Sequence, residues 1–471
     1  MSTSGIFLNP IDKTFYKFIQ YPNSIEMIKV KSSLEKILQD STNPIWMLRH
    51  SLGISGGEEN YSHFHKSKDL NLEREHELNL CMLDKKHIRN LFYKGLKVST
   101  EENEYSHAVG PIHAGIIEPG HFRFIVRGEE IQNLLIRLGF QHRGIQNILV
   151  KKNPIQAIPI SETISGDSTI AYAIAFSRIY ETALQETIPL EVTLQRAVLL
   201  ELERVAMHIG DLGAMSGDIG YYPLHGVCAT DRGAPLGMME VLTGSRFGKG
   251  SVFPSQLLLN SKLSSRTILQ SLENLKKAYS RVEKEFKRAT KHATIRERLQ
   301  DCGIITKSQV QNYSFLGMVS RSSGVEQDLR LGEEFYSNYK HKLELKIDYP
   351  KYTGDVWSRF YLRFNEIKNS IEWLLKVLPE FPITEFDKTK FLKLQNLKIN
   401  SGLYYSAVEG FRGNVLVALY LNQKAQIEAS YIRDPSVLNW HALELAARGA
   451  LIGDFPINNK SFNLSYVGFD L

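Results

Sequence analysis

The chain has 471 residues, of which 43% are apolar and 23% charged, and its formal net charge is +6. This composition is typical of a globular protein of two or three domains with a large buried core. The modest positive charge fits contact with an anionic surface or an acidic subunit, and we expect no nucleic-acid partner.

The three cysteines, Cys81, Cys228 and Cys302, stand far apart and form no C-x-x-C pair. The sequence therefore predicts neither a disulfide framework nor a cysteine metal site, and it favours a reduced cytosolic compartment. The first residues lack a signal-peptide pattern, and no apolar run approaches the roughly 20 residues that cross a bilayer. We expect any membrane association to go through a partner or a surface.

Residues 1–104 are predicted to form a small α+β domain, followed by a larger domain over residues 105–471. The predicted elements of the first domain are two apolar runs and two helical patches, at residues 25–30, 45–48, 32–38 and 84–92. Residues 55–75 are polar and loop-like, and the acidic run at residues 101–104 marks the boundary between the domains.

The larger domain begins with an alternating strand at residues 122–126 and a segment of helical spacing at residues 130–138 that ends at Gly139. Longer helices are predicted further along, with Ser168 and Thr193 as caps for the first two, at residues 168–184, 193–218, 231–243, 255–292 and 354–378. Strands return from residue 404, with turns at residues 413–414 and 422–423, before a helix at residues 435–449. The predicted fold class is α+β and mainly α: a helical-bundle core with small β-sheet elements near both ends.

The predicted helix at residues 193–218 carries a polar stripe. Its members recur at steps of three and four and are Glu201, Arg204, His208, Asp211, Met215 and Asp218. Neighbouring positions are largely apolar. Two interpretations stay open: an ordinary exposed face, which the pattern alone favours, and a buried polar line that passes protons or holds a polar headgroup.

Four histidines cluster in sequence before the helices: His107, His113, His121 and His142. Their spacings match no zinc pattern and no cysteine accompanies them, so no metal site is predicted. The turn pairs at residues 110–111 and 119–120 would point His113 and His121 toward one place; the alternative is loop histidines bonded to the backbone. No G-x-G-x-x-G follows a strand, so we expect no dinucleotide site on this chain.

Several motifs, in the same order, make residues 109–471 resemble one superfamily. They are residues 110–124 (GPIHAGIIEPGHFRF), 142–144 (HRG), 201–213 (ELERVAMHIGDLG), 243–246, 321–330, 408–413 (VEGFRG) and 433–435. This superfamily comprises the large subunits of membrane-bound nickel–iron hydrogenases, such as that of formate hydrogenlyase, and the D subunit of NADH–quinone oxidoreductase, respiratory complex I. The resemblance implies a hydrogenase large-subunit-like bundle, and it extends only faintly, as a C-subunit-like domain, into the first hundred residues.

The chain departs from the hydrogenases at the metal site. A hydrogenase of this superfamily binds nickel through two C-x-x-C pairs, which fall here at Ser165 and Ser168 and at Ser436 and Asn439. Hydroxyl and amide groups are poor ligands for soft metals, because they do not lose a proton near neutral pH. The resemblance therefore implies a lost nickel site, and a nickel–iron hydrogenase is the least favoured interpretation.

The resemblance implies instead the quinone chemistry of the D subunit, where a loop histidine and a tyrosine bind the headgroup and an aspartate stands behind the histidine. Asp218 matches that aspartate and His113 the first histidine of the family's loop. A small insertion displaces the second histidine, and we assign its role to His121; no tyrosine stands at the expected place near Glu162. The candidate catalytic residues are His113, His121, Asp218 and His208. The candidate cavity residues are Ser165, Ser168, Arg143, Ser436 and Asn439, and Arg204 and Asp211 would couple the reaction to ion translocation.

The resemblance also implies partners and a location. A quinone would be the substrate, this chain would bind no cofactor, and electrons would come from an iron–sulfur cluster in a small partner subunit. Antiporter-like membrane subunits would hold the chain on the cytoplasmic side of the inner membrane. The implied activity is that of an NADH dehydrogenase-like oxidoreductase, active only within a complex that binds NAD elsewhere. A non-catalytic scaffold subunit is the alternative.

Overall fold

The computed structural model describes residues 2–8, 14–30, 103–113, 117–333, 336 and 340–471. The predicted elements at residues 32–38, 45–48, 55–75 and 84–92 lie outside these ranges, as does half of the acidic run at residues 101–104. The division into residues 1–104 and 105–471 therefore stays a prediction.

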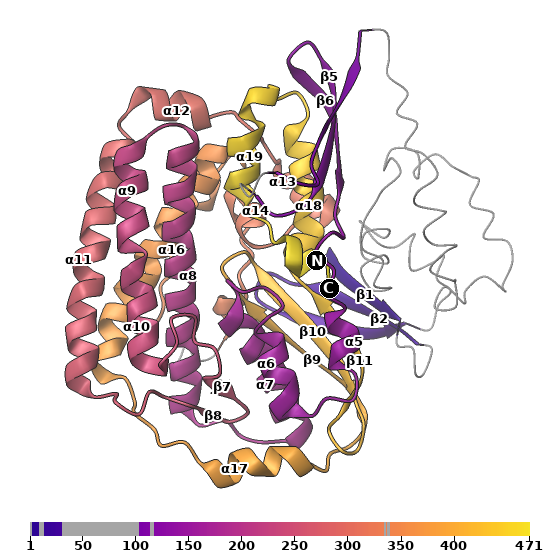
Figure 1. Cartoon of the computed structure of the whole chain (residues 1–471), viewed down its shortest axis with the longest axis vertical. Helices are drawn as coiled ribbons and strands as arrows, with labels where there is room; N and C mark the ends of the chain where they lie inside the picture. The colour runs from indigo at the N-terminus through magenta and orange to yellow at the C-terminus, as the bar shows by residue number, and fades with distance from the viewer. Residues whose placement is uncertain (1, 9–13, 31–102, 114–116, 334–335, 337–339) are drawn as a thin grey trace, which may run out of the picture.

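Long helices packed side by side form the bundle on one side of the molecule (Figure 1). They are α8 (Leu190–Asp218), α9 (Tyr222–Asp231), α10 (Gly233–Thr243), α11 (Ser265–Ala289) and α16 (Val356–Val377). Helix α8 contacts α9, α10 and α16, and its apolar residues are buried on nearly every side. A helix that is apolar all round belongs in a core, which explains why α8 is the centre of the bundle.

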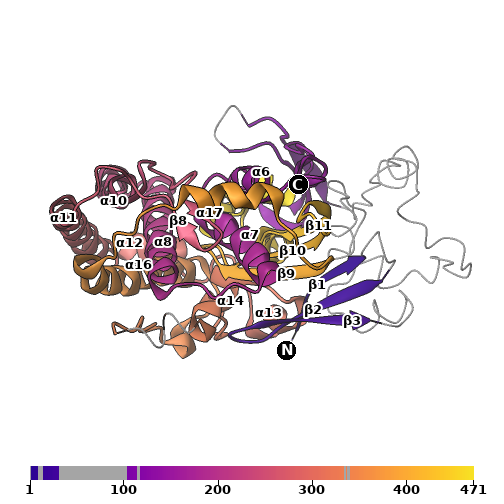
Figure 2. The ribbon, with the colours of Figure 1, turned by 90° about the horizontal axis from the view of Figure 1, so that it is seen from below.

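A three-stranded antiparallel sheet lies beside the bundle, with β10 (Asn414–Leu421) between β9 (Gly402–Glu409) and β11 (Ile427–Arg433). Successive side chains of a strand point to opposite faces, so Val415 and Val417 join the main core while Leu416 and Ala418 face the other way. Helix α7 (Thr169–Leu184) covers the first face. The N-terminal sheet of β1 (Ser2–Leu8), β2 (Phe15–Gln20) and β3 (Ile25–Val30) covers the second (Figure 2).

A third sheet contains β4 (Tyr105–Val109), β5 (His121–Arg127) and β6 (Glu130–Arg137), and it packs on α18 (Ser436–Ala447) and α19 (Phe455–Phe462). The predicted strand at residues 122–126 is confirmed within β5. The predicted helix at residues 130–138 is wrong, because this segment is the second strand of a hairpin. Gly128 at φ 62° allows the tight turn, and Ile131 and Leu134 are buried by strand pairing that spacing alone does not reveal.

The helix predictions are confirmed in type, with shifted ends. Helix α8 begins at Leu190, and the Thr193 hydroxyl donates to Pro189 O instead of capping a helix start. Residues 222–231 form α9, which was not predicted. The stretch predicted as one helix at residues 255–292 instead begins with β8 (Gln256–Leu257), which pairs with β7 (Val252–Phe253), and continues with α11, which Ser264 caps. The predicted hairpins after residue 404 are confirmed.

The remaining helices are short. They are α5 (Ile145–Leu149), α6 (Pro154–Ser161), α12 (Ala293–Leu299), α13 (Lys307–Tyr313), α14 (Gly317–Ser322), α17 (Lys388–Lys393) and α20 (Tyr466–Phe469). In the part of the chain that the structure describes, no helix combines the length and the apolar character needed to cross a bilayer. The fold class is confirmed: mainly helical, with small separate sheets near both ends of the chain.

Candidate functional site

The polar stripe of α8 is buried as far as Met215, and only its last member, Asp218, is exposed. Glu201, Arg204 and His208 are each 0% exposed, and Asp211 is 5% exposed. The exposed-face interpretation of this stripe is therefore wrong. Charged groups in a protein interior need partners of opposite charge, and the neighbouring elements supply them.

These partners form one buried network with α8. Its members are Glu201, Arg204, His208, Arg321, Asp328, Arg330, Glu366 and Glu409. Glu366, from α16, lies at the centre: Oε1 accepts a bond from Arg321 at 2.8 Å, and Oε2 lies 3.0 Å from His208 Nε2. Arg321, from α14, also donates to Glu409 at 2.7 Å, which ties the end of β9 to the bundle.

The remaining bonds of the network close it on the other side. Arg330 donates to Asp328 at 2.7 Å and to Glu201 at 3.2 Å, and Arg204 donates to the same Glu201 carboxylate at 3.2 Å. Burial opposes ionisation of Glu366, but Arg321 and His208 outweigh it and hold the pKa of this carboxyl well below its usual value. Glu366 is thus an ionised group that residues from several elements hold in place.

A polar cleft of about 530 Å³ lies beside the turn that precedes α7. Arg412, from the turn between β9 and β10, donates to both oxygens of Asp167 at 2.7 and 2.5 Å. The remaining lining residues come mainly from the loop before β5, the turn before α7, the end of α19 and the chain after it. Those used below are Ile117, Glu118, Ser165, Asn459, Lys460, Asn463 and Tyr466. The positively charged Arg412 side chain on the wall can also donate to a polar or anionic group that enters the cleft.

Two of the four positions that match metal ligands, Ser165 and Ser436, are linked through Ser465. Ser165 and Ser465 line this cleft, whereas Ser436 is fully buried. The Ser165 hydroxyl lies 3.1 Å from the Ser465 hydroxyl, and Ser465 N donates to Ser436 Oγ at 2.9 Å. Ser168 is buried in the same turn, where its N–H donates to Ser165 O at 2.9 Å. Asn439 lies further along α18.

The Asn439 side chain bonds to the backbone of another turn. Its Oδ1 accepts from Leu316 N at 2.9 Å, and its Nδ2 donates to Leu316 O at 3.1 Å. This paired bonding satisfies a short loop before α14. The three serines, Ser165, Ser168 and Ser436, therefore lie near one another, while the amide of Asn439 bonds to a neighbouring turn.

A second, apolar cleft of about 890 Å³ lies between the loop before β5 and the end of α8. His113 and Asp218 both line it, together with aromatic residues such as Phe122 and Phe455. His113 Nε2 donates to Gly120 O at 2.6 Å. Burial raises the pKa of Asp218, and Lys460 opposes this shift. Ile117, Asn459 and Lys460 line both clefts, so the polar and apolar clefts adjoin.

The remaining candidate residues lie away from the cleft walls. His121 Nδ1 lies 3.3 Å from Gly110 O, within the loop. Arg143 donates to Thr163 O at 2.8 Å and Ile164 O at 2.9 Å, so it fixes the chain that leads into the Ser165 turn. His208 and Arg204 belong to the buried network.

Asp211 connects α8 to the polar cleft. Its Oδ2 accepts from Arg363 at 2.9 Å and its Oδ1 from Asn463 Nδ2 at 2.7 Å. Asn463 lines the polar cleft, and its backbone oxygen accepts a bond from Arg412. A displacement of Arg412 would therefore reach α8 through two hydrogen bonds.

Of the residues that line the polar cleft, only Ser165 was a sequence candidate, and the charged or aromatic ones Glu118, Asp167, Arg412 and Tyr466 were not. Glu118 and Arg412 lie within motifs that the sequence singles out, at residues 110–124 and 408–413. Burial and the nearby Asp167 raise the pKa of Glu118. Tyr466 comes from the last residues of the chain, far in sequence from Glu162, where a tyrosine was expected.

Comparison with known proteins gives relatives among hydrogenase subunits and NADH-quinone oxidoreductase subunits. The family described as respiratory-chain NADH dehydrogenase, 49 Kd subunit, matches residues 218–470. The membrane-bound hydrogenase subunit alpha of Pyrococcus furiosus is 26% identical over 65% of this chain and 73% of its own length. The D subunit of NADH-quinone oxidoreductase from Desulfotalea psychrophila is 27% identical over 74% of this chain and 91% of its own length.

A solved structure has the same fold. It is a chain of the membrane-bound sulfane sulfur reductase, an archaeal respiratory membrane complex, with a TM-score of 0.70 at 20% identity. The match covers 78% of this chain and 99% of that chain.

Proposed function

Because this chain belongs to the family of the respiratory-chain NADH dehydrogenase 49 Kd subunit, we propose that it is an oxidoreductase subunit of a complex I-like or membrane-bound hydrogenase-like respiratory complex, with a quinone as electron acceptor. The observation that carries the acceptor class is the pair of adjoining clefts, one polar and one apolar, that share Ile117, Asn459 and Lys460. Together they suit an amphiphilic molecule with a polar head and a hydrocarbon tail.

The polar cleft supplies what a quinone headgroup needs. Each carbonyl oxygen of a quinone accepts a hydrogen bond, and Arg412, Lys460 and Tyr466 provide donor groups on the wall. Reduction to the quinol takes two electrons and two protons. Glu118 and Asp218 hold protons more tightly than ordinary carboxyls, because burial raises the pKa of each, and this favours them as proton donors.

The tail would lie in the apolar cleft, against Phe122, Phe124 and Phe455. His113, on the same wall, would bond to the part of the headgroup nearest the tail. His121, the first residue of β5, would position the preceding loop through Gly110 O.

Nickel does not fit this donor set. Ser165, Ser168 and Ser436 offer hydroxyls, and the Asn439 amide is already bonded to Leu316. None of these groups is a thiolate, which is what a soft metal requires. The electrons would therefore reach the cleft from an iron–sulfur cluster in a small partner subunit.

Coupling to ion translocation would pass through Asp211, Arg204 and His208. The polar cleft is linked to Asp211 through Asn463, and α8 carries all three residues along one stripe. Antiporter-like membrane subunits would then respond to the structural change transmitted along α8. This chain would be a peripheral subunit on the cytoplasmic side of the membrane.

The test is electron transfer by the assembled complex to quinones that differ only in tail length. We expect KM to fall as the tail grows, because more apolar surface is buried in the cleft. Ala214→Phe, which fills part of the apolar cleft, should remove this dependence, while Ala229→Phe on the exposed side of α9 should keep it. A complex that reduces no quinone at all would favour the scaffold alternative.

A further inference from the structure

The buried network contains four carboxyl groups but only three guanidinium groups. The acids are Glu201, Asp328, Glu366 and Glu409, and the bases are Arg204, Arg321, Arg330 and the imidazole of His208. All eight side chains belong to residues that are at most 3% exposed. With every acid ionised and His208 neutral, one negative charge would be left over. An uncompensated charge in a protein interior is costly, which favours a bound proton on one of the four acids. The buried Arg433, which donates to Asn414 O at 3.0 Å, is a further guanidinium whose charge acts on Glu409.

His208 is poorly placed to carry that proton. Its Nε2 bonds to Glu366 at 3.0 Å, but its Nδ1 is buried and has no hydrogen-bond partner among the described residues. An imidazolium has N–H donors on both nitrogens, so protonation would leave one of them buried and unsatisfied. Burial accordingly lowers the pKa of His208, although Glu366 opposes this shift.

Glu409 makes fewer bonds than the other three acids. It accepts from Arg321 at 2.7 Å and from Leu329 N at 3.3 Å. Glu366, by contrast, bonds to Arg321, His208 and Arg204, and Glu201 and Asp328 are each held by Arg330 with further donors. Burial and the neighbouring Asp328 raise the pKa of Glu409, against the opposing charges of Arg321 and Arg204.

We propose that Glu409 stores the one exchangeable proton of the buried network. A proton arriving from water forms an O–H bond on this carboxylate and brings the charge of the network from −1 to zero. Loss of that proton restores the charge. The proposal assigns a role to a residue that lies in the VEGFRG motif but has no contact with either cleft in the described structure.

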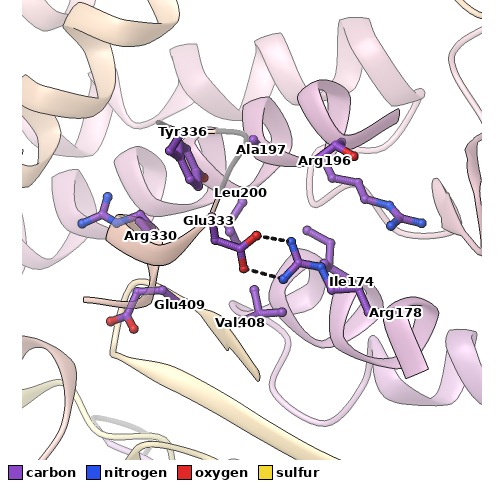
Figure 3. A pocket seen from close by; sticks show the side chains of 11 residues that line it. Ile174, Arg178, Arg196, Ala197, Leu200, Arg330, Glu333, Tyr336, Val408 and Glu409 are labelled. Atoms are coloured by element: carbon purple, nitrogen blue, oxygen red, sulfur yellow. Dashed lines mark hydrogen bonds and ion pairs between the residues drawn. The ribbon is translucent and has the colours of Figure 1, made fainter. Parts of the chain in front are cut away.

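Glu409 and a partly exposed ion pair line the same small cavity (Figure 3). The cavity measures about 20 Å³, which is enough for one water molecule, and Glu409 and Arg330 line it. Arg178 and Glu333 line it as well; they point toward each other and are joined at 2.6 and 2.8 Å. Their side chains are 30% and 27% exposed, so this is a short route between solvent and the network.

The stored proton lies three residues from the wall of the polar cleft. Arg204 donates to Glu409 O at 2.6 Å and to Gly410 O at 3.0 Å, which fixes the turn that ends at Arg412. A change in charge at Glu409 therefore acts on the segment that holds Arg412 against Asp167. This link to the acceptor rests on the proposed function, whereas the position of the proton does not.

Infrared difference spectroscopy of the full chain at neutral pH tests the position of the proton. A protonated carboxyl has a carbonyl stretch apart from the amide bands, and we expect Glu409→Gln to lose one such band relative to the unaltered protein. Glu333→Gln, which changes a partly exposed glutamate, should lose none. If Glu409→Gln loses no band and His208→Gln gains one, the proton resides on His208 and the proposal is wrong.

Thermal unfolding of the same variants gives a second measurement. If Glu409 is already neutral, an amide of the same shape should shift Tm by less than about 2 °C. Glu366→Gln removes an ionised partner from Arg321 and should lower Tm by more than about 5 °C. Equal losses in the two variants would show that Glu409 is ionised, whatever the acceptor of the complex proves to be.

Discussion

The buried network and the Asp167–Arg412 pair use the same chemistry in different surroundings. In the network, Glu366 is 0% exposed and bonds to groups from two other helices, α8 and α14. In the polar cleft, the Asp167 side chain is 32% exposed, although its partner Arg412 is 7% exposed. Fully buried charged side chains are held in place by their partners and contribute to the stability of the fold. A charged side chain at a cleft can instead give up its partner and bind a ligand.

The largest loss of stability is expected for a substitution in the buried network, where the charged side chains have no contact with solvent. Arg321→Ala leaves Glu366 without its main cation and removes a hydrogen-bond donor from Glu409. Loss of one partner of a buried ion pair costs roughly 3–5 kcal/mol. We expect the free energy of unfolding, measured by urea denaturation of the full chain, to fall by about this amount. Arg127→Ala is the matched control, because the Arg127 side chain is 50% exposed in its pair with Glu104.

An exposed ion pair contributes only about 0–1 kcal/mol. Equal losses in Arg321→Ala and Arg127→Ala would show that the network is not enclosed in solution.

The cleft should respond in ligand binding more than in stability. Arg412→Ala removes a hydrogen-bond donor from the cleft wall. The Asp167 carboxylate can then be solvated by water, so the loss of stability is smaller than when a buried carboxylate loses its partner. We expect KM for a quinone to rise about 10–100-fold, which corresponds to one or two lost charge-assisted hydrogen bonds. Steady-state electron transfer by the assembled complex measures it, and Arg412→Lys should recover part of the loss, because lysine keeps the charge but not the two-pronged geometry.

Urea denaturation of Arg412→Ala completes the comparison with Arg321→Ala. A loss of stability as large as that of Arg321→Ala, with KM unchanged, would make Arg412 a structural residue and remove it from the cleft chemistry.

Sequence patterns located the α8 stripe but could not decide its surroundings. Steps of three and four placed Glu201, Arg204 and His208 on one face, and that face could equally have met solvent. This face is buried because Arg321, Arg330 and Glu366 contact it, and these residues lie more than a hundred residues further along the chain. Pairing between distant segments is set by tertiary packing, and periodicity carries no record of it.

The same reasoning explains the missed strand and the missed tyrosine. Residues 130–137 have spacing that fits a helix, and only pairing with β5 makes them a strand. Tyr466 reaches the polar cleft because α20 packs against α18, which no local pattern predicts. Motifs, in contrast, contained Glu118 and Arg412 and gave the family, since they depend on local sequence alone.

Glu203 sharpens the comparison, because it is a buried carboxyl of α8 outside the network. Its Oε2 accepts from Ile170 N at 2.7 Å, and Oε1 has no hydrogen-bond partner among the residues that the structure describes. Burial raises its pKa to about 8. The unfolded chain has a glutamate pKa of about 4.3, so between these values the folded state binds more protons and stability falls as pH rises.

The size of this effect is about 1.4 kcal/mol per pH unit for a single group. We expect the stability of the unaltered chain to fall relative to Glu203→Gln as the pH of urea denaturation is raised from about 6 to about 8. Glu191→Gln, at the exposed start of α8, should follow the unaltered chain. Parallel curves for Glu203→Gln and the unaltered chain would contradict a protonated Glu203.

The smallest effect is expected at the bond that joins the two regions. Asn463 donates to Asp211 at 2.7 Å and has a φ of 48°, a conformation that glycine adopts without strain. Asn463→Gly therefore removes the side-chain bond while the backbone can stay in place, and the cost should be about 1 kcal/mol of stability. If Asp211 couples the cleft to the bundle, membrane vesicles that contain the complex should translocate fewer ions for each pair of electrons, with electron transfer reduced less than about threefold. An unchanged ion-to-electron ratio would show that the buried network and the cleft act independently, so that α8 stabilises the fold and has no part in coupling.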